Sequence, residues 1–178
     1  MYQDIIKFWF KDIQPSQWWV KNLAFDRLVL DKFSEIHLQA SQCELYEWRE
    51  KPLGRLAEII VLDQFSRNMF RGSALSFAYD SMALTLSQEA VSLGVDQKLS
   101  PIERSFLYMP YMHSESLKIH DVAMRLFQMN GIQNNFDYEI KHRDVIEKFG
   151  RYPHRNELLG RESTKEEIVF LNQPGSRF

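Results

Sequence analysis

A carboxylate and a guanidinium group lie four residues apart within an apolar segment of the chain. Asp63 and Arg67 are separated by about one helical turn, and at about 100° per residue both point along the same stripe as Leu56, Ile60 and Phe70. Removing either ion from water is unfavourable by several kcal/mol unless the ion is paired, hydrogen-bonded or in contact with water. The spacing therefore predicts either a buried salt bridge or the wall of a polar pocket, and it leaves both open.

Histidines repeat this pattern on two other predicted helices. His142 lies at the centre of an apolar face between Tyr138 and Val145, and His120 and His113 point inward from a neighbouring helix. A histidine with an ordinary pKa of about 6.5 can act as a general acid or a general base near neutral pH. A core role and a catalytic role both stay open, and His113 and His142 are the candidates for acid–base catalysis.

The stretch from 150 to 163 departs from helical patterning and is rich in hydrogen-bond donors. Its donors are the side chains of Arg151, His154, Arg155, Asn156 and Arg161. Guanidinium groups bind carboxylates and phosphates through two parallel hydrogen bonds, so the stretch is suited to an anion. The alternative is a short helical turn whose arginines cap neighbouring carbonyl groups or pair with Glu157 and Glu162.

Several other chemistries find no support in the sequence. It has no Gly-x-Ser-x-Gly nucleophile motif and no glycine-rich phosphate loop. Glu139 and His142 match one half of the Glu-x-x-His pattern of di-iron proteins, but no second copy occurs. A mononuclear site from His113, Glu115 and His142 has weak support, so we expect no metal and no cofactor. The lone Cys43 falls on the apolar stripe of a predicted helix, where we expect it to pack as a small hydrophobic residue.

These side chains must be positioned by helices, because the 178-residue chain has helical periodicity and no alternating segment typical of a strand. Capping boxes at Ser100–Glu103 and Thr164–Glu167 mark two helix starts. The predicted helices span 2–11, 22–47, 53–70, 75–93, 101–112, 115–129, 136–149 and 164–172. We expect an all-α fold of about eight helices in antiparallel pairs, forming a single domain over residues 1–178.

The composition limits the partners. The chain has 22 Lys and Arg against 24 Asp and Glu, so no overall basic field attracts nucleic acid. No apolar run approaches the roughly 20 residues of a membrane helix, and a single cysteine fits a reducing compartment. We therefore expect a cytoplasmic protein with neither nucleic-acid nor membrane partners.

The segments Leu62–Gly72, Tyr108–Glu115 and Phe149–Arg161 resemble the three signatures of a bacterial family named domain of unknown function 924. The positions that match its signatures are Asp63, Gln64, Arg67, Asn68, Arg71, His113, Ser114, Glu115, His142, Arg151, His154, Arg155, Asn156 and Arg161. The resemblance covers nearly the whole chain and implies a tetratricopeptide-like arrangement of helix pairs, with no established activity. Ser66 stands where the family is expected to have proline. His120 stands where glutamine is expected, which lowers its candidacy as a catalytic residue.

Together these features predict binding of a small anion, a carboxylate or a phosphate, in a pocket lined by Arg, His and Asp. Acid–base catalysis by His113 or His142 is an extension of this hypothesis. The candidate ligand-binding residues are Asp63, Arg67, Asn68, Arg71, Glu115, Arg151, His154, Arg155, Asn156 and Arg161. One alternative is a tetratricopeptide-like scaffold that binds a peptide or protein, and another is a purely structural network that locks the helices together.

Overall fold

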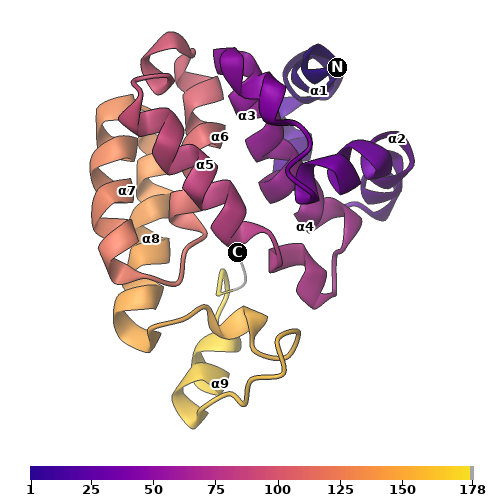
Figure 1. Cartoon of the computed structure of the whole chain (residues 1–178). Helices are drawn as coiled ribbons and strands as arrows, with labels where there is room; N and C mark the ends of the chain where they lie inside the picture. Colours follow the sequence, from indigo (N-terminus) through magenta and orange to yellow (C-terminus); the bar gives the residue numbers. More distant parts are fainter. Residues whose placement is uncertain (177–178) are drawn as a thin grey trace.

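The computed structural model describes residues 1–176, which form helices joined by turns (Figure 1). The α-helices are α1 (Tyr2–Lys7), α2 (Leu23–Ser41), α3 (Pro52–Ile60), α4 (Ser66–Met69), α5 (Asp80–Ser92), α6 (Pro101–Met112), α7 (Leu117–Asn130), α8 (Gln133–Phe149) and α9 (Lys165–Leu171). The described residues contain no strand, which confirms the all-α prediction. Within the same residues, none of the helices combines the length and apolar character that crossing a bilayer requires.

The centre of the molecule is one helical segment made of α3, the π turn Val61–Phe65 and α4. Its apolar side chains from Leu56 to Phe65 are completely buried, and Leu53 and Met69, near its two ends, are partly buried. The polar side chains of Glu58, Asp63 and Ser66 are buried in the same stretch, so the segment is enclosed on all sides between Leu56 and Ser66. A helix enclosed in this way needs a partner for each polar side chain, and this requirement gives rise to the site described below.

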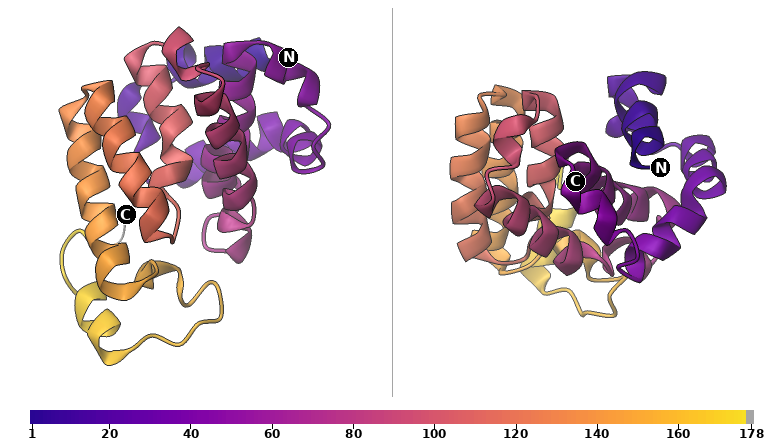
Figure 2. Two further views of the ribbon diagram at one scale, coloured as in Figure 1. Left: turned by 60° about the vertical axis from the view of Figure 1, so that its left-hand side comes forward. Right: turned by 45° about the horizontal axis from the view of Figure 1, so that its top comes forward.

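The other helices pack around this central segment. α6 contacts α3 directly, and α6, α7 and α8 pack against one another in chain order on one side of the molecule (Figures 1 and 2). α1 and α2 pack against the central segment from the other side (Figure 1). The 3₁₀ turn Pro153–Arg155 and α9 lie together beyond the end of α8. The tetratricopeptide-like character of this packing stays a prediction.

The boundaries of several helices agree with the sequence. The helix predicted over 101–112 is α6, with the capping box between Ser100 and Glu103 at its start. The segment predicted over 53–70 is helical, but its α-helical hydrogen bonding changes to that of a π helix over Val61–Phe65. α5 begins at Asp80, later than predicted, because a separate 3₁₀ turn precedes it.

The helix predicted over 22–47 ends at Ser41, and the prediction for Cys43 was wrong. The amide of Cys43 bonds to the carbonyl of Ala40, and the amide of Glu44 bonds to the carbonyl of Gln39, which is the Schellman pattern of a helix end. Cys43 has a φ of 61°, and its side chain is exposed. This conformation is usually taken by glycine. Because the position holds cysteine instead, the sequence offered no glycine signal for the end of α2.

Close packing of the central segment predicts the effect of a substitution at Gly54 in α3. A β-carbon at this position would lie 2.0 Å from the carbonyl oxygen of Trp48, which is backbone and cannot move aside as a flexible side chain can. Glycine-to-alanine changes in exposed helices stabilise by about 1 kcal/mol. At this position we expect Gly54→Ala to lower the free energy of unfolding by about 1–3 kcal/mol, because overpacking outweighs helix propensity.

The measurement is urea unfolding followed by circular dichroism. Gln88→Ala, at an exposed position of α5, is the control and should change the free energy of unfolding by less than about 0.5 kcal/mol. A Gly54→Ala protein that is as stable as wild type, or more stable, would contradict the close approach of Trp48.

Candidate functional site

Asp63 lies in the π turn at the centre of the molecule, and its side chain is 1% exposed. Its Oδ1 atom is 2.7 Å from Nδ1 of His113 and 3.0 Å from Nη1 of Arg67. Its Oδ2 atom accepts a hydrogen bond of 2.6 Å from Nε2 of Gln64. Burial alone would raise the pKa of Asp63. The charge of Arg67 and the bonds from His113 and Gln64 outweigh burial, so the pKa lies below its usual value. Asp63 is therefore ionised at neutral pH.

Asp63 determines the tautomer of His113, the residue that caps the C-terminal end of α6. An ionised carboxylate can only accept hydrogen bonds, so Nδ1 of His113 carries the hydrogen and Nε2 of the neutral ring has a lone pair. Burial and the charge of Arg67 lower the pKa of His113, although Asp63 opposes them. No group in residues 1–176 bonds Nε2, and the side chain is 15% exposed. His113 thus presents a basic nitrogen.

The interactions of Asp63 continue into a closed ring of five residues. Arg67 donates two hydrogen bonds of 3.0 Å to the carboxylate of Asp80, at the start of α5. Arg155 donates from Nη1 to the same carboxylate at 3.1 Å and from Nη2 to the carbonyl oxygen of His113 at 2.9 Å. We call Asp63, Arg67, Asp80, Arg155 and His113 the five-residue ring. Its two arginines balance its two acids, so its net charge is zero when His113 is neutral.

Arg155 is held in the ring by aromatic contacts. Its guanidinium carbon lies 4.5 Å from the ring centre of Phe77 and 4.6 Å from that of Tyr152. The Nε–H groups of Arg155 and of Arg161 are buried and have no acceptor among the described residues. A buried donor without an acceptor is destabilising by about 1–3 kcal/mol. Each of these two groups would be satisfied by an oxygen atom that reached it.

Side chains cap three consecutive carbonyl groups at the end of α6. Tyr152 donates its hydroxyl to the oxygen of Met112 at 2.5 Å, Arg155 donates to His113, and Nε2 of His120 donates to Ser114 at 2.9 Å. The last carbonyl groups of a helix have no partners within the helix. These three bonds, from α7 and from the segment 150–163, therefore fix the backbone on both sides of His113.

Histidines gather around the ring of Tyr152. The ring centre of Tyr152 is 5.8 Å from that of His142, 5.5 Å from that of His154 and 6.3 Å from that of His120. Burial lowers the pKa of His142 and that of His154 to about 3, so both are neutral at pH 7. Nδ1 of His142 donates to the carbonyl oxygen of Tyr138 at 2.7 Å. No group of three or more His, Cys, Asp or Glu side chains in residues 1–176 is arranged to hold a metal ion.

The remaining candidates of the segment 150–163 form ion pairs and hydrogen bonds near the ring. Arg161 donates two bonds to Glu115, at 2.7 and 2.9 Å, and Glu115 also accepts from the amide of Tyr152 at 2.8 Å. Arg151 forms a two-bond pair with Glu167 in α9, and Asn156 donates to Ser163. The acid partners are therefore Glu115 and Glu167, rather than the neighbouring glutamates that the helical-turn alternative named.

Two predicted residues lie outside this group. Asn68 and Arg71 both donate to the carboxylate of Asp26 in α2, at distances of 2.5–2.8 Å. These bonds join the end of α4 to α2, and none of them involves the five-residue ring.

Sequence reasoning missed three residues of the site. Asp80 joins the two arginines of the ring, and Phe77 and Tyr152 hold Arg155. An acid in the first turn of a helix is common because it favours the helix dipole, so Asp80 carried no distinctive signal. Tyr152 could have been found, since it lies within one of the three motifs and between predicted donors.

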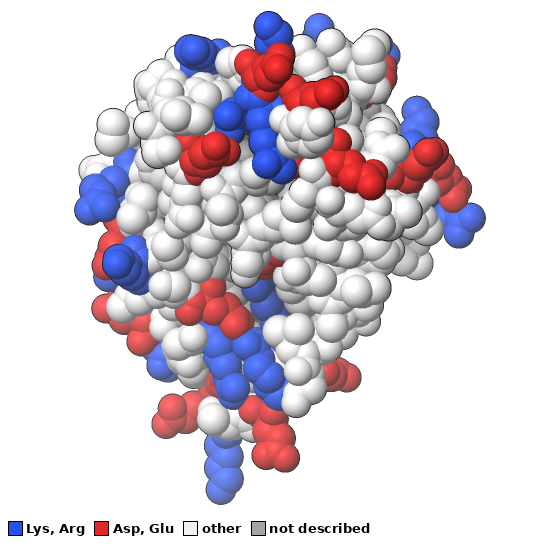
Figure 3. Space-filling view, viewed as in Figure 1, with Lys and Arg blue, Asp and Glu red and all other residues white. Residues whose placement is uncertain are grey.

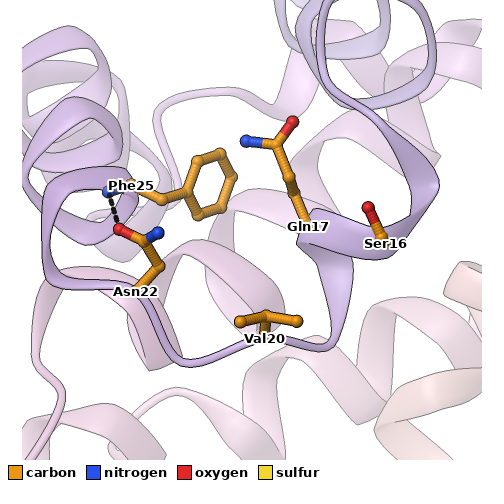
Figure 4. Close-up of a pocket in the computed structure, with 5 residues that line it drawn as sticks. All are labelled: Ser16, Gln17, Val20, Asn22 and Phe25. Carbon is orange, nitrogen blue, oxygen red and sulfur yellow. Dashed lines mark hydrogen bonds between the residues drawn. The ribbon is translucent and has the colours of Figure 1, made fainter.

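Two cavities lie away from the five-residue ring. One of about 200 Å³ is lined by Ser16, Gln17, Val20, Asn22 and Phe25, and Asn22 accepts the amide hydrogen of Phe25 at its edge (Figure 4). The other, of about 300 Å³, lies between α8 and the turn after α9, with Lys141 and Lys148 in its lining. Neither lining includes a predicted site residue. On the face shown in Figure 3, acidic and basic side chains lie together at the top and below the centre, and the surface between these two regions is largely uncharged.

Comparison with known proteins places these residues in a wider group. Residues 5–175 match the family model described as a bacterial protein of unknown function (DUF924). A solved structure of a protein of unknown function, ATU0120 from Agrobacterium tumefaciens, is 40% identical in sequence. The match covers 96% of each chain, with a TM-score of 0.91. No curated protein matches the chain.

The burial of Asp63 predicts how stability depends on pH. The pKa of its carboxyl group is lower in the folded protein than in the unfolded chain, where it is about 3.9. The ionised group therefore contributes its full stabilisation above about pH 5, and this contribution is lost as the pH falls towards the folded pKa. We expect Asp63→Asn to lower the free energy of unfolding by about 3–5 kcal/mol at pH 7, and by less at pH 3.

Urea unfolding of wild type and variant at both pH values provides the measurement. Asp144→Asn, which changes an exposed acid of α8, is the matched control and should have little effect at either pH. A loss for Asp63→Asn that is equally large at pH 3 and pH 7 would contradict the lowered pKa of Asp63.

Proposed function

Because the chain belongs to the DUF924 family of bacterial proteins of unknown function, its role must be inferred from its residues, and we propose that the five-residue ring binds a small anion. The anion is a carboxylate or a phosphate, and His113 acts on the bound molecule as a general base. The observation that carries this proposal is the 2.7 Å contact between Asp63 and His113 inside a ring that also contains two guanidinium groups.

His113 has the arrangement expected of a general base. A carboxylate that accepts the Nδ1–H bond of a histidine holds the ring in one tautomer and orientation, with Nε2 available for a proton. The lowered pKa of His113 keeps this nitrogen unprotonated at neutral pH. His142 is less suited to the role, since its pKa of about 3 makes it a weak base and its side chain is buried.

The guanidinium groups are suited to hold the anion. Arg67 is 20% exposed and is fixed by Asp63 and Asp80, so little conformational entropy is lost when it receives a ligand. The buried Nε–H of Arg155 needs an acceptor, which an oxygen of the anion supplies. Because Asp63 and Asp80 already balance the two arginines, direct hydrogen bonds rather than the net charge of the ring would select the ligand.

The purely structural alternative makes a different prediction. If the ring only locked the helices together, its residues would affect stability and no anion would bind to it. The test is therefore a binding experiment in which the loss of binding is separated from the loss of stability.

We expect a panel of small carboxylates and inorganic phosphate to include at least one anion that raises the melting temperature of the wild-type protein. An anion at 100 times its Kd contributes about 2.7 kcal/mol, which corresponds to an increase of roughly 5–10 °C for a chain of this length. Arg155→Lys keeps the positive charge but removes the Nε–H group and the planar fork, and we expect it to lose most of this increase.

Arg143→Ala is the matched control, because Arg143 pairs with the exposed acids Asp121 and Glu147 outside the ring. This variant should respond to the anion as wild type does. An equal response from Arg155→Lys, or no response of wild type to any member of the panel, would count against the proposed function.

A further inference from the structure

A second pair of titratable groups lies beside the five-residue ring. His120 of α7 and Glu139 of α8 are both fully buried, with 2.7 Å between Nδ1 and Oε1. The other ring nitrogen of His120, Nε2, is 2.9 Å from the carbonyl oxygen of Ser114 and 3.2 Å from the hydroxyl of Tyr152. The second carboxyl oxygen of Glu139 has no hydrogen-bond partner among the described residues. The pair therefore reaches the turn that follows His113.

Hydrogen counting gives this group two arrangements. With one proton shared between Glu139 and Nδ1, the ring keeps its hydrogen on Nε2, and Nε2 donates to Ser114. Without that proton, the carboxylate of Glu139 needs a donor, so the single ring hydrogen moves to Nδ1. Nε2 then has a lone pair, which is repelled by the Ser114 oxygen and accepts from the hydroxyl of Tyr152 instead.

We propose that His120 and Glu139 are positioning residues for His113, and that the proton they share decides whether His120 bonds to Ser114 or to Tyr152. In the first arrangement the carbonyl groups of Met112, His113 and Ser114 are all capped, which holds His113 against Asp63. In the second, Ser114 loses its donor, and the hydroxyl of Tyr152 turns from Met112 to His120. The backbone is then released on both sides of His113.

The direction of the pH dependence follows from burial. The pKa of Glu139 is raised, because the effect of burial outweighs the lowering effects of the bond from His120 and of the charges of His120 and Arg143. As the pH rises through this raised pKa, the shared proton is lost and so is the bond to Ser114. The other titratable side chains close to the pair are Tyr152, on the segment 150–163, and His142, on α8; the charges of His113 and His154 also act on His142.

This inference rests on the proposed role of His113, but it concerns where His113 is held and not whether an anion binds. The experiment therefore measures the ring of His113 in the full-length protein without ligand. Nitrogen-15 NMR of the histidine side chains reports the tautomer of each ring, and hydrogen exchange reports the opening of the amides of His113 and Ser114. A failure to find any anion ligand leaves both readouts intact.

In His120→Leu we expect His113 to exchange between tautomers, and the amides of His113 and Ser114 to exchange about tenfold faster, as the loss of one buried hydrogen bond implies. The matched control is Ser87→Ala in α5. It removes a buried hydroxyl that donates to the carbonyl of Leu107 in α6, the helix whose C-terminal end His113 caps. This control should lower overall stability and leave the tautomer of His113 unchanged. Equal behaviour of the two variants would overturn the proposal.

Glu139→Gln decides the matter even if His120→Leu does not fold. The glutamine amide donates to Nδ1 of His120 at every pH, so the bond from Nε2 to Ser114 persists. In wild type we expect protection of the His113 and Ser114 amides, corrected for intrinsic exchange, to decrease as the pH rises. In Glu139→Gln we expect no such decrease, and identical profiles for the two proteins would show that the shared proton has no such effect.

Discussion

A carboxylate at the centre of a protein is tolerated only when it is paired and hydrogen-bonded, and this requirement of Asp63 organises the candidate site. The helical segment that carries Asp63 is buried from Leu56 to Ser66, so the partners of Asp63 must come from the segment itself or from the elements packed against it. His113, Arg67 and Gln64 meet the need. Arg67 then requires its own second acid, because one guanidinium has more donors than Asp63 can accept.

That second acid closes the ring. Asp80 accepts from Arg67 and from Arg155, and Arg155 returns to the carbonyl oxygen of His113. The ring thereby joins the π turn, the start of α5, the end of α6 and the turn Pro153–Arg155. Segments that are separated in the chain are locked together by charged hydrogen bonds in a region of low dielectric, where such bonds are strong and where a missing partner is correspondingly unfavourable.

The interactions that make burial of Asp63 tolerable are also those that hold His113 in the arrangement proposed for a general base. The carboxylate selects one tautomer, the capped carbonyl groups hold the backbone, and burial together with the neighbouring guanidinium lowers the pKa of His113 and keeps its ring neutral. Prearranged dipoles and charges of this kind contribute to catalysis because they need not reorganise during a reaction. Under the proposed function, stability and reactivity are therefore coupled in this site, and a substitution in the five-residue ring would affect both.

The helices were largely predictable because periodicity and capping are local properties. The 101–112 helix has the boundaries of α6, and the i, i+4 contact of Asp63 with Arg67 lies within one helical segment. The end of α2 was not predictable, since Cys43 takes a conformation typical of glycine. The site needed more than local information, because Asp63 and His113 are 50 residues apart and Asp80 and Arg155 are 75 apart. Which inward-facing charges meet depends on how the helices pack, and packing is governed by the combined shape of many apolar side chains rather than by any short pattern.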